Sequence, residues 1–477
     1  MRESRGAPGG RVSAAVGLRE PRVSDLRVDV SESARAEASR DFGGLTRGQA
    51  TGVIAPRTAL EVEAAVRIAI ATGEKLTPRG QGMSQSGQSV PRSGVSLDLR
   101  GLDAVGEPDT VQGTISVEPG ATWRQVLARC AARGFRPPVM PLNLDLSVGG
   151  TLSAGGFGSS SFRHGVAAGN VARLEVVTGK GELVVASRDE APAVFGAVLG
   201  GLGRVGVIVR AELELVPTKP RTRTLYLLHD SPAKLLKDML VLSERPDVHH
   251  IEGFCAASMQ GLALAPNGKR EPFVHWLYGL HVSCEVDRPA TLPTPSHLVN
   301  GLSEPKLLRV EEDDTAAFAA RYDARFEMMR KTGGWNQLHP WFECLMPFER
   351  ATDLIPQILA RLPLFLGDGQ RLFLLPQKGY PPAMAFPKGD PVVGFAILPV
   401  GVPEPLREPA LAALKSVHDL VLASGGKRYA SGWLFDMGDA EWKAHHGSQY
   451  PWLASAKAAL DPHGVFESCL SGPTFRR

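Results

Sequence analysis

The chain has 477 residues, of which 43% are hydrophobic and 22% charged, and its formal net charge is +3. This length exceeds the size at which one hydrophobic core usually stops growing, so we expect two domains or lobes. Lys and Arg are dispersed rather than gathered into a basic stripe, which argues against a nucleic-acid partner. No apolar run approaches the roughly 18 residues of a spanning helix, so we predict no membrane segment.

The cysteines and the first residues bear on metal binding and location. The five cysteines lie far apart, which gives neither a CxxC metal cluster nor a disulfide framework. We therefore expect no metal site and a reduced, cytoplasmic setting. Residues 1–40 carry positive charge but lack the apolar segment of a secretory signal, and their Gly, Arg and Ser content predicts a disordered leader.

In chain order, strand and helix patterns alternate from residue 51 onward. Residues 51–56 predict a strand, and residues 57–73 predict a helix with apolar positions every three or four residues. Two strands, a helix and a hairpin follow, at 94–102, 113–120, 122–134 and 170–187. A further strand pattern ends near residue 215, where a basic stretch with prolines indicates a crossing to a second lobe.

The richest local signal is the segment PRGQGMSQSGQS at 78–89. Its glycines permit positive φ and close backbone approach, and successive N–H groups in such a loop form a nest suited to a diphosphate. The segment lacks both the Gly-Lys-Ser/Thr ending of a P-loop and the GxGxxG spacing of a Rossmann turn. Taken alone, a Gly and Ser cluster of this kind is more often a solvated turn than a binding loop.

Two more glycine-rich stretches strengthen the binding interpretation. Residues 147–156 and 159–165 again offer small side chains and backbone amides, and residues 199–208 present apolar backbone suited to a flat ring system. We expect these stretches to line one long groove that an extended dinucleotide fills.

These motifs together resemble those of flavin oxidoreductases of the vanillyl-alcohol-oxidase and PCMH type, most closely the cytokinin dehydrogenases. The motifs that carry the resemblance are DFGG at 41–44, the loop 79–88, VEPGATW at 117–123, SVGGTLS at 147–153, FRHG at 162–165, LEVVTGKGE at 174–182, GAVLGGLGRVGVI at 196–208, HPW at 339–341 and the close at 441–462. The resemblance implies an α+β fold. It comprises a PCMH-type FAD-binding domain of two α/β subdomains at 41–215, and a substrate domain at 216–430 with an antiparallel sheet backed by helices. The segment 431–477 is expected to return to the FAD-binding domain.

The resemblance also implies which residues contact FAD. The expected contacts are Arg79, Gly80, Gln81, Gly82, Met83, Ser84, Gln88, Ser147, Gly149, Gly150, Ser153, Phe157, His164, Ile208 and Trp433. For His164 the alternative is a turn anchor bonded to backbone. The alignment that suggests Trp433 is loose, and Trp341 of the HPW motif is expected in the core rather than at a substrate.

Two positions depart from the pattern of the family. The position whose histidine is covalently attached to flavin in plant cytokinin dehydrogenases is Met83 here, so we predict FAD held without a covalent bond. The position of the family's proton-accepting aspartate is Leu142, which cannot take a proton. Asp145 is the nearest substitute, but on an extended segment residues three apart point to opposite faces, and its alternative role is a solvated or capping carboxylate.

These observations predict an FAD-dependent oxidoreductase that transfers a hydride from a small amine or alcohol to flavin N5. Oxygen or another compound would accept the electrons, and no residue is assigned as the catalytic base. Two alternatives stay open. One is a cytokinin dehydrogenase with a relocated base, and the other is an FAD-binding protein that has lost catalysis.

Overall fold

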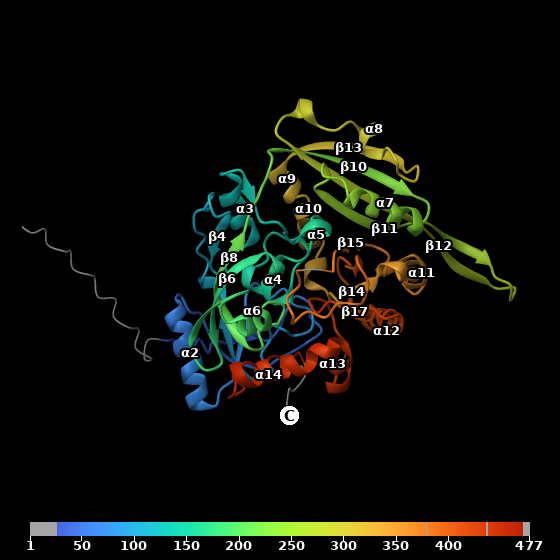
Figure 1. Ribbon diagram of the computed structural model, residues 1–477. Helices are drawn as coiled ribbons and strands as arrows, with labels where there is room; N and C mark the ends of the chain where they lie inside the picture. Colours follow the sequence, from blue (N-terminus) through green and yellow to red (C-terminus); the bar gives the residue numbers. More distant parts are fainter. Residues whose placement is uncertain (1–25, 378, 436, 471–477) are drawn as a thin grey trace, which may run out of the picture.

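A computed structural model describes residues 26–377, 379–435 and 437–470. Helices and sheets are mixed, and the strands form separate parallel and antiparallel sheets, which confirms the predicted α+β class. The first and second lobes lie side by side (Figure 1). The glycine-rich segments 78–89, 147–156 and 199–208 belong to the first lobe, which is coloured blue to green. Within the described residues, no helix is both long and apolar enough to cross a membrane.

A small parallel sheet begins the first lobe. Its strands have the order β1-β3-β2, and they span Ala50–Ile54 (β1), Leu76–Arg79 (β2) and Gly94–Asp98 (β3). The helix α2 (Ala59–Thr72) begins where the Thr58 hydroxyl accepts a hydrogen bond from the Glu61 amide, and it ends at Gly73, whose φ is 75°. Its apolar face packs into a core shared with both sheets of this lobe.

A four-stranded antiparallel sheet completes the first lobe. Its order is β4-β8-β6-β7, and the strands span Thr114–Val117 (β4), Val171–Thr178 (β6), Leu183–Ser187 (β7) and Gly206–Glu214 (β8). The predicted hairpin is present, since β6 pairs with β7. The helices around this sheet are α3 (Trp123–Ala131), α4 (Val148–Ala154), α5 (Ser161–His164) and α6 (Pro192–Val198), and the short strands β5 (Phe135–Arg136) and β9 (Val216–Pro217) pair nearby.

An eight-stranded antiparallel sheet forms the second lobe, in the order β13-β10-β12-β11-β15-β16-β14-β17. Its strands span Arg221–His229 (β10), His250–Leu264 (β11), Arg270–Val286 (β12), Lys306–Asp314 (β13), Phe342–Pro347 (β14), Gln370–Leu375 (β15), Val392–Ile397 (β16) and Lys427–Arg428 (β17). The helices of this lobe are α7 (Pro232–Ser243), α8 (Pro295–Val299), α9 (Thr315–Ala319), α10 (Asp323–Lys331), α11 (Phe348–Leu359) and α12 (Arg407–Ala423).

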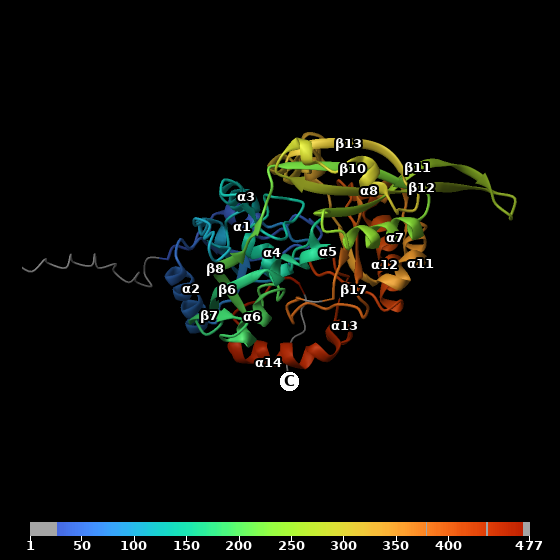
Figure 2. The same cartoon turned by 45° about the horizontal axis from the view of Figure 1, so that its top comes forward.

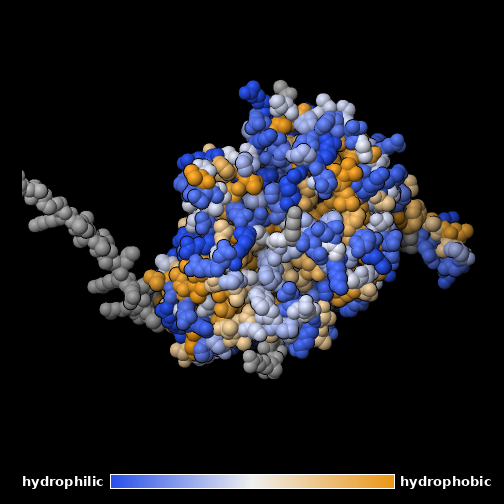
Figure 3. Space-filling view, viewed as in Figure 1, coloured by the Kyte–Doolittle hydropathy of each residue, from blue (hydrophilic) through white to orange (hydrophobic). Residues whose placement is uncertain are grey.

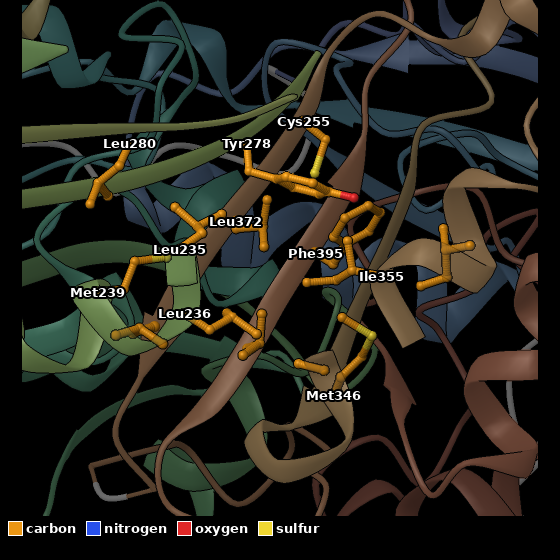
Figure 4. Packing of buried hydrophobic residues seen from close by; sticks show 14 of the residues in the cluster. Leu235, Leu236, Met239, Cys255, Tyr278, Leu280, Met346, Ile355, Leu372 and Phe395 are labelled. Carbon is orange, nitrogen blue, oxygen red and sulfur yellow. The ribbon is translucent and has the colours of Figure 1, made fainter. Parts of the chain in front are cut away.

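Side-chain alternation gives the central strands of this sheet two different faces. On β14, Phe342 and Cys344 belong to the core that α7, α11 and α12 cover, whereas Leu345 belongs to the core of the first lobe. Figure 4 shows the helix-covered side, where Leu235 of α7 lies near Leu372 of β15. The alternate residues of these strands, such as Leu345, therefore face the first lobe.

The hairpin of β11 and β12 extends well beyond the rest of the sheet, and its far end projects from the body of the molecule (Figure 2). Met259, Leu262 and Leu264 are exposed there. Part of this projecting end is hydrophobic in Figure 3.

The last described residues lie against the first lobe. The helices α13 (Asp439–His446) and α14 (Tyr450–Leu460) run along one side of the molecule (Figure 1). The Leu76 amide then donates to the Val465 carbonyl at 2.9 Å, and the Glu467 amide donates to the Leu76 carbonyl at 3.1 Å. The domain boundaries expected from the sequence stay predictions.

The predicted leader needs one correction. Residues 1–25 lie outside the described residues, but the helix α1 (Glu32–Ala38) forms within the stretch expected to be disordered. The Ser31 hydroxyl caps this helix, and Asp29 pairs with Val53 of β1 through two backbone hydrogen bonds. This long-range pairing orders the stretch, and composition alone could not reveal it.

Candidate functional site

One cavity lies between the first lobe and the eight-stranded sheet. Its first-lobe walls are the loop after β2, the stretch 141–157 that contains α4, and the turn into β8. Its other walls are α10, the central strands β14, β15 and β16, and residues 429–431. The cavity brings together the predicted contact residues Arg79, Gly80, Gln81, Gly82, Met83, Ser84, Gln88, Ser147, Gly149, Gly150, Ser153, Phe157 and Ile208.

The loop after β2 has the backbone expected of an anion nest. Gly82 has φ 67° and Gly87 has φ 76°, conformations that favour glycine. A Cβ at Gly80 would lie 2.1 Å from the Ser147 hydroxyl oxygen, so the two glycine-rich segments meet closely there. Among the described residues, no acceptor is recorded for the backbone amides of Gln81 and Met83. These free donors fit the diphosphate of the FAD that the resemblance implies.

Asp41, far from the loop in the sequence, holds it in shape. Its carboxylate accepts hydrogen bonds from the Ser84 hydroxyl at 2.9 Å and from the Gly87 amide at 2.8 Å. Burial raises the pKa of Asp41 to about 6, against the opposing effect of these donors and of Arg79. Asp41 therefore supports the loop from behind and does not line the cavity.

Two motifs that are distant in the sequence meet beside this loop. Phe42 stacks on His339, with their ring centroids 3.9 Å apart. The Phe42 amide also donates to the Gly82 carbonyl, which ties this aromatic cluster to the loop. Trp341 lines the cavity and donates from Nε1 to the Pro399 carbonyl at 2.9 Å. Trp341 therefore borders the cavity, whereas the sequence predicts it in the core.

His164 and Trp433 do not line the cavity within the described residues. His164 ends the short helix α5, and burial together with Arg136 lowers its pKa to about 4, so it is neutral. The Trp433 amide donates to the Trp341 carbonyl at 2.6 Å, which places it behind the cavity wall. For both residues, contact with the cofactor stays a prediction.

The segment 141–147 contains Leu142, the residue at the position of the family's proton-accepting aspartate. Leu142 lines the cavity, as expected for the position of the family's aspartate, but its side chain is apolar. Asp145 is exposed and pairs with Arg124, with its Oδ1 2.7 Å from the arginine Nε. Arg124 also binds Asp323 of α10. The carboxylate of Asp145 therefore belongs to a surface ion-pair network and does not point into the cavity.

The sequence did not single out the polar residues on the sheet side of the cavity. Glu343 of β14 and Arg371 of β15 line it, as do Tyr429 and Tyr322. The Tyr429 hydroxyl accepts a hydrogen bond from the Gly156 amide at 2.7 Å and so joins the two lobes at the cavity. A lone acid between apolar residues, two positions after HPW, was the available signal for Glu343.

Comparison with known proteins shows the family to which the chain belongs. A profile described as FAD binding domain matches residues 50–187, which include both the loop and α4. The chain is 30% identical to cytokinin dehydrogenase 5 of Oryza sativa subsp. japonica, across 94% of this chain and 92% of that protein. It is 29% identical to the uncharacterized oxidoreductase ORF5 in the fasciation locus of Rhodococcoides fascians, across 90% of this chain and 94% of the relative. Cytokinin dehydrogenase 7 of Oryza sativa subsp. japonica is 28% identical, across 93% and 90% of the two chains. The protein therefore belongs to the cytokinin dehydrogenase family and is an FAD-dependent oxidoreductase.

Proposed function

We propose that the protein oxidises a small amine or alcohol by hydride transfer to flavin N5, with FAD bound without a covalent link. The main support for this proposal is the set of residues that line the cavity between the two lobes. Its first-lobe wall offers backbone amides and small residues, and its sheet wall offers a carboxylate, a guanidinium and aromatic rings. When bound, FAD supplies a two-electron oxidant that accepts a hydride.

The residues of this chain would bind and orient the cofactor. The loop amides are suited to the diphosphate, and the small residues of α4 leave room beside it. The Ser84 hydroxyl donates to Asp41 and keeps the loop in place. Gln88 donates from Nε2 to the Ala430 carbonyl at 2.8 Å, and this bond ties the loop to the stretch that carries Tyr429. Trp341 and Phe373 on the opposite wall would exclude water from the reacting atoms.

Met83 supports the proposal of dissociable FAD. Its side chain is a thioether, which has no ring nitrogen to bond the flavin. Among the described residues that line the cavity, none is a histidine or a cysteine. We expect the cofactor to be held by hydrogen bonds and ring contacts alone.

A test of the attachment needs only the purified protein. Acid precipitation should leave yellow flavin in the supernatant, because no covalent bond retains it, and the absorbance of supernatant and pellet measures this directly. Flavin that stays in the pellet would contradict the proposal. Colourless protein that fails to bind added FAD would instead favour a chain without catalysis.

A second candidate is a cytokinin dehydrogenase with a relocated base. The names of the rice relatives favour it, while Leu142 at the position of the family's base weighs against it. Anaerobic bleaching of the flavin by an adenine-type cytokinin, but not by simple amines or alcohols, would support this candidate over the broader proposal.

A further inference from the structure

Three residues from three strands form a row across the sheet wall of the cavity. In the register of the sheet, Arg371 of β15 lies opposite Ala396 of β16, and Ala396 lies opposite Glu343 of β14. All three line the cavity. Two strand spacings separate the backbones of Arg371 and Glu343, a distance of about 10 Å. The small side chain of Ala396 leaves open space between the carboxylate and the guanidinium.

Glu343 is the only carboxylate among the described residues that line the cavity. The Ser431 hydroxyl donates to its Oε2 and fixes its position. Arg428 lies close, but its guanidinium is bonded to the Glu343 backbone carbonyl, the Trp433 carbonyl and His418 Nδ1. Among the residues that the structure describes, the carboxylate of Glu343 forms no ion pair, so it is available to a bound molecule.

The other end of the row carries excess positive charge. Arg371 and Arg321 share a single carboxylate, that of Glu252, with the Arg371 Nε 3.3 Å and the Arg321 Nη2 3.1 Å from its oxygens. Nearby His281 is neutral, because burial lowers its pKa to about 4. One positive charge therefore stays uncompensated beside the cavity, and it favours an anionic or strongly hydrogen-bond-accepting group.

We propose that Glu343 is the catalytic base and that Arg371 anchors the opposite end of the substrate. This assignment rests on the proposed oxidation of an amine or alcohol. In the reaction, the substrate C–H bond breaks and its electron pair leaves with the hydrogen as hydride to FAD. The substrate N–H or O–H bond breaks, its proton passes to a Glu343 carboxylate oxygen, and a C=N or C=O bond forms. The substrate class is a small molecule with CH–NH or CH–OH at one end and a carboxylate or similar acceptor at the other.

The ionisation of Glu343 suits this role. Burial raises the pKa of Glu343 to about 7, and the Ser431 hydrogen bond and Arg428 oppose that shift only in part. The neighbouring Cys344 thiol and Tyr429 hydroxyl both have a raised pKa and stay neutral near pH 7. Burial lowers the pKa of Arg428 to about 10, so its guanidinium keeps its charge near pH 7. Because a base must be deprotonated, the rate of flavin reduction should rise with pH through about 7 and then level off.

The first test measures anaerobic reduction of the FAD-loaded protein by stopped flow. The probes are 4-(aminomethyl)benzoate and 4-(hydroxymethyl)benzoate, with benzylamine and benzyl alcohol as matched compounds without the carboxylate. Glu343→Gln should slow reduction by about 10²- to 10⁴-fold and abolish the inflection near pH 7. Glu343→Asp should keep the inflection at a reduced rate, and Asp145→Asn should match the wild type.

A second measurement does not depend on turnover. Infrared titration of the wild type should show one protonated carboxyl that disappears near pH 6, from Asp41, and another that disappears near pH 7, and Glu343→Gln should lack only the second. Arg371→Gln should raise KM for the carboxylate probes by on the order of 10- to 100-fold, with little change for benzylamine or benzyl alcohol.

The possible results distinguish a failure of the roles given to Glu343 and Arg371 from a failure of the proposed oxidation itself. If no probe bleaches the wild-type flavin, the proposed oxidation fails, and the assignment fails with it. If the probes bleach wild type and Glu343→Gln equally fast, the oxidation stands and Glu343 is not the base. A carboxyl band that still titrates near pH 7 in Glu343→Gln would overturn the assignment of the base. Equal KM changes for both probe classes in Arg371→Gln would overturn the assignment of the anchor.

Discussion

Gly82→Ala should weaken FAD binding by on the order of 100-fold, because alanine fits neither the backbone angle nor the space at this position. Gly82 has φ 67°, and a Cβ there would lie 2.2 Å from Arg79 Nη2. The left-handed angle costs a non-glycine residue about 1–2 kcal/mol. The displaced guanidinium would lose its bonds to the Arg40 and Ser89 carbonyls, at about 1 kcal/mol each. The sum is about 3–4 kcal/mol. Because the loop would relieve this strain by leaving the conformation that binds FAD, most of it is lost from binding, and each 1.4 kcal/mol is roughly a factor of ten in affinity.

Gly73→Ala is the matched control for this substitution. Gly73 has φ 75° at the end of α2, and nothing lies within 4 Å of the position where its Cβ would be. The control should therefore lose about 1–2 kcal/mol of stability from the same backbone strain, with FAD affinity unchanged. Titration of each apoprotein with FAD, followed by flavin fluorescence, measures the affinities, and thermal unfolding measures the stabilities. Equal affinities in the two variants would show that the loop does not hold the cofactor.

The first-lobe wall of the cavity was largely predictable, because its signals are local. Glycines at 80, 82 and 87 imply a particular backbone whatever surrounds them, and two of them do have positive φ. The helix α2 was likewise predictable, because Thr58 caps its first turn and Gly73 ends it. Counting along the motif placed Leu142 in the cavity. Asp145 lies apart from the cavity, but it lies on a turn and not on the extended segment that the strand argument assumes.

The sheet wall was not predictable, because it depends on register between distant segments. Glu343, Arg371 and Ala396 come from three strands, and only the pairing of β15 with β16 and of β16 with β14 sets them in a row. A shift of one residue in either pairing would turn a side chain to the helix-covered face. Nothing in the local sequence around Glu343 specifies that register. The ordered helix α1 was missed for a similar reason, since a contact with β1 stabilises it.

Glu252→Gln should destabilise the second lobe by about 3–5 kcal/mol, the usual cost of leaving a buried charge unpaired. The Glu252 side chain is only 2% exposed, and it lies against both Arg321 and Arg371 and accepts a hydrogen bond from the Tyr322 hydroxyl. Burial alone would raise the pKa of Glu252, but the two arginines and Tyr322 hold it below its usual value of 4.5. A depressed pKa means that the stabilisation is fully present above about pH 4.5 and is lost as the pH falls through the folded-state pKa.

Urea unfolding at neutral pH measures this loss, and repeating it at lower pH tests its electrostatic origin, because the gap between wild type and variant should narrow in acid. Asp145→Asn is the matched control, since it breaks an ion pair whose side chains are 49% and 41% exposed and should cost less than about 1 kcal/mol. A gap that is the same at every pH would mean that Glu252 acts through shape rather than charge. Because Tyr322 and Arg371 also line the cavity, the electrostatic result would tie the stability of this lobe to the arginine that we assign to substrate binding.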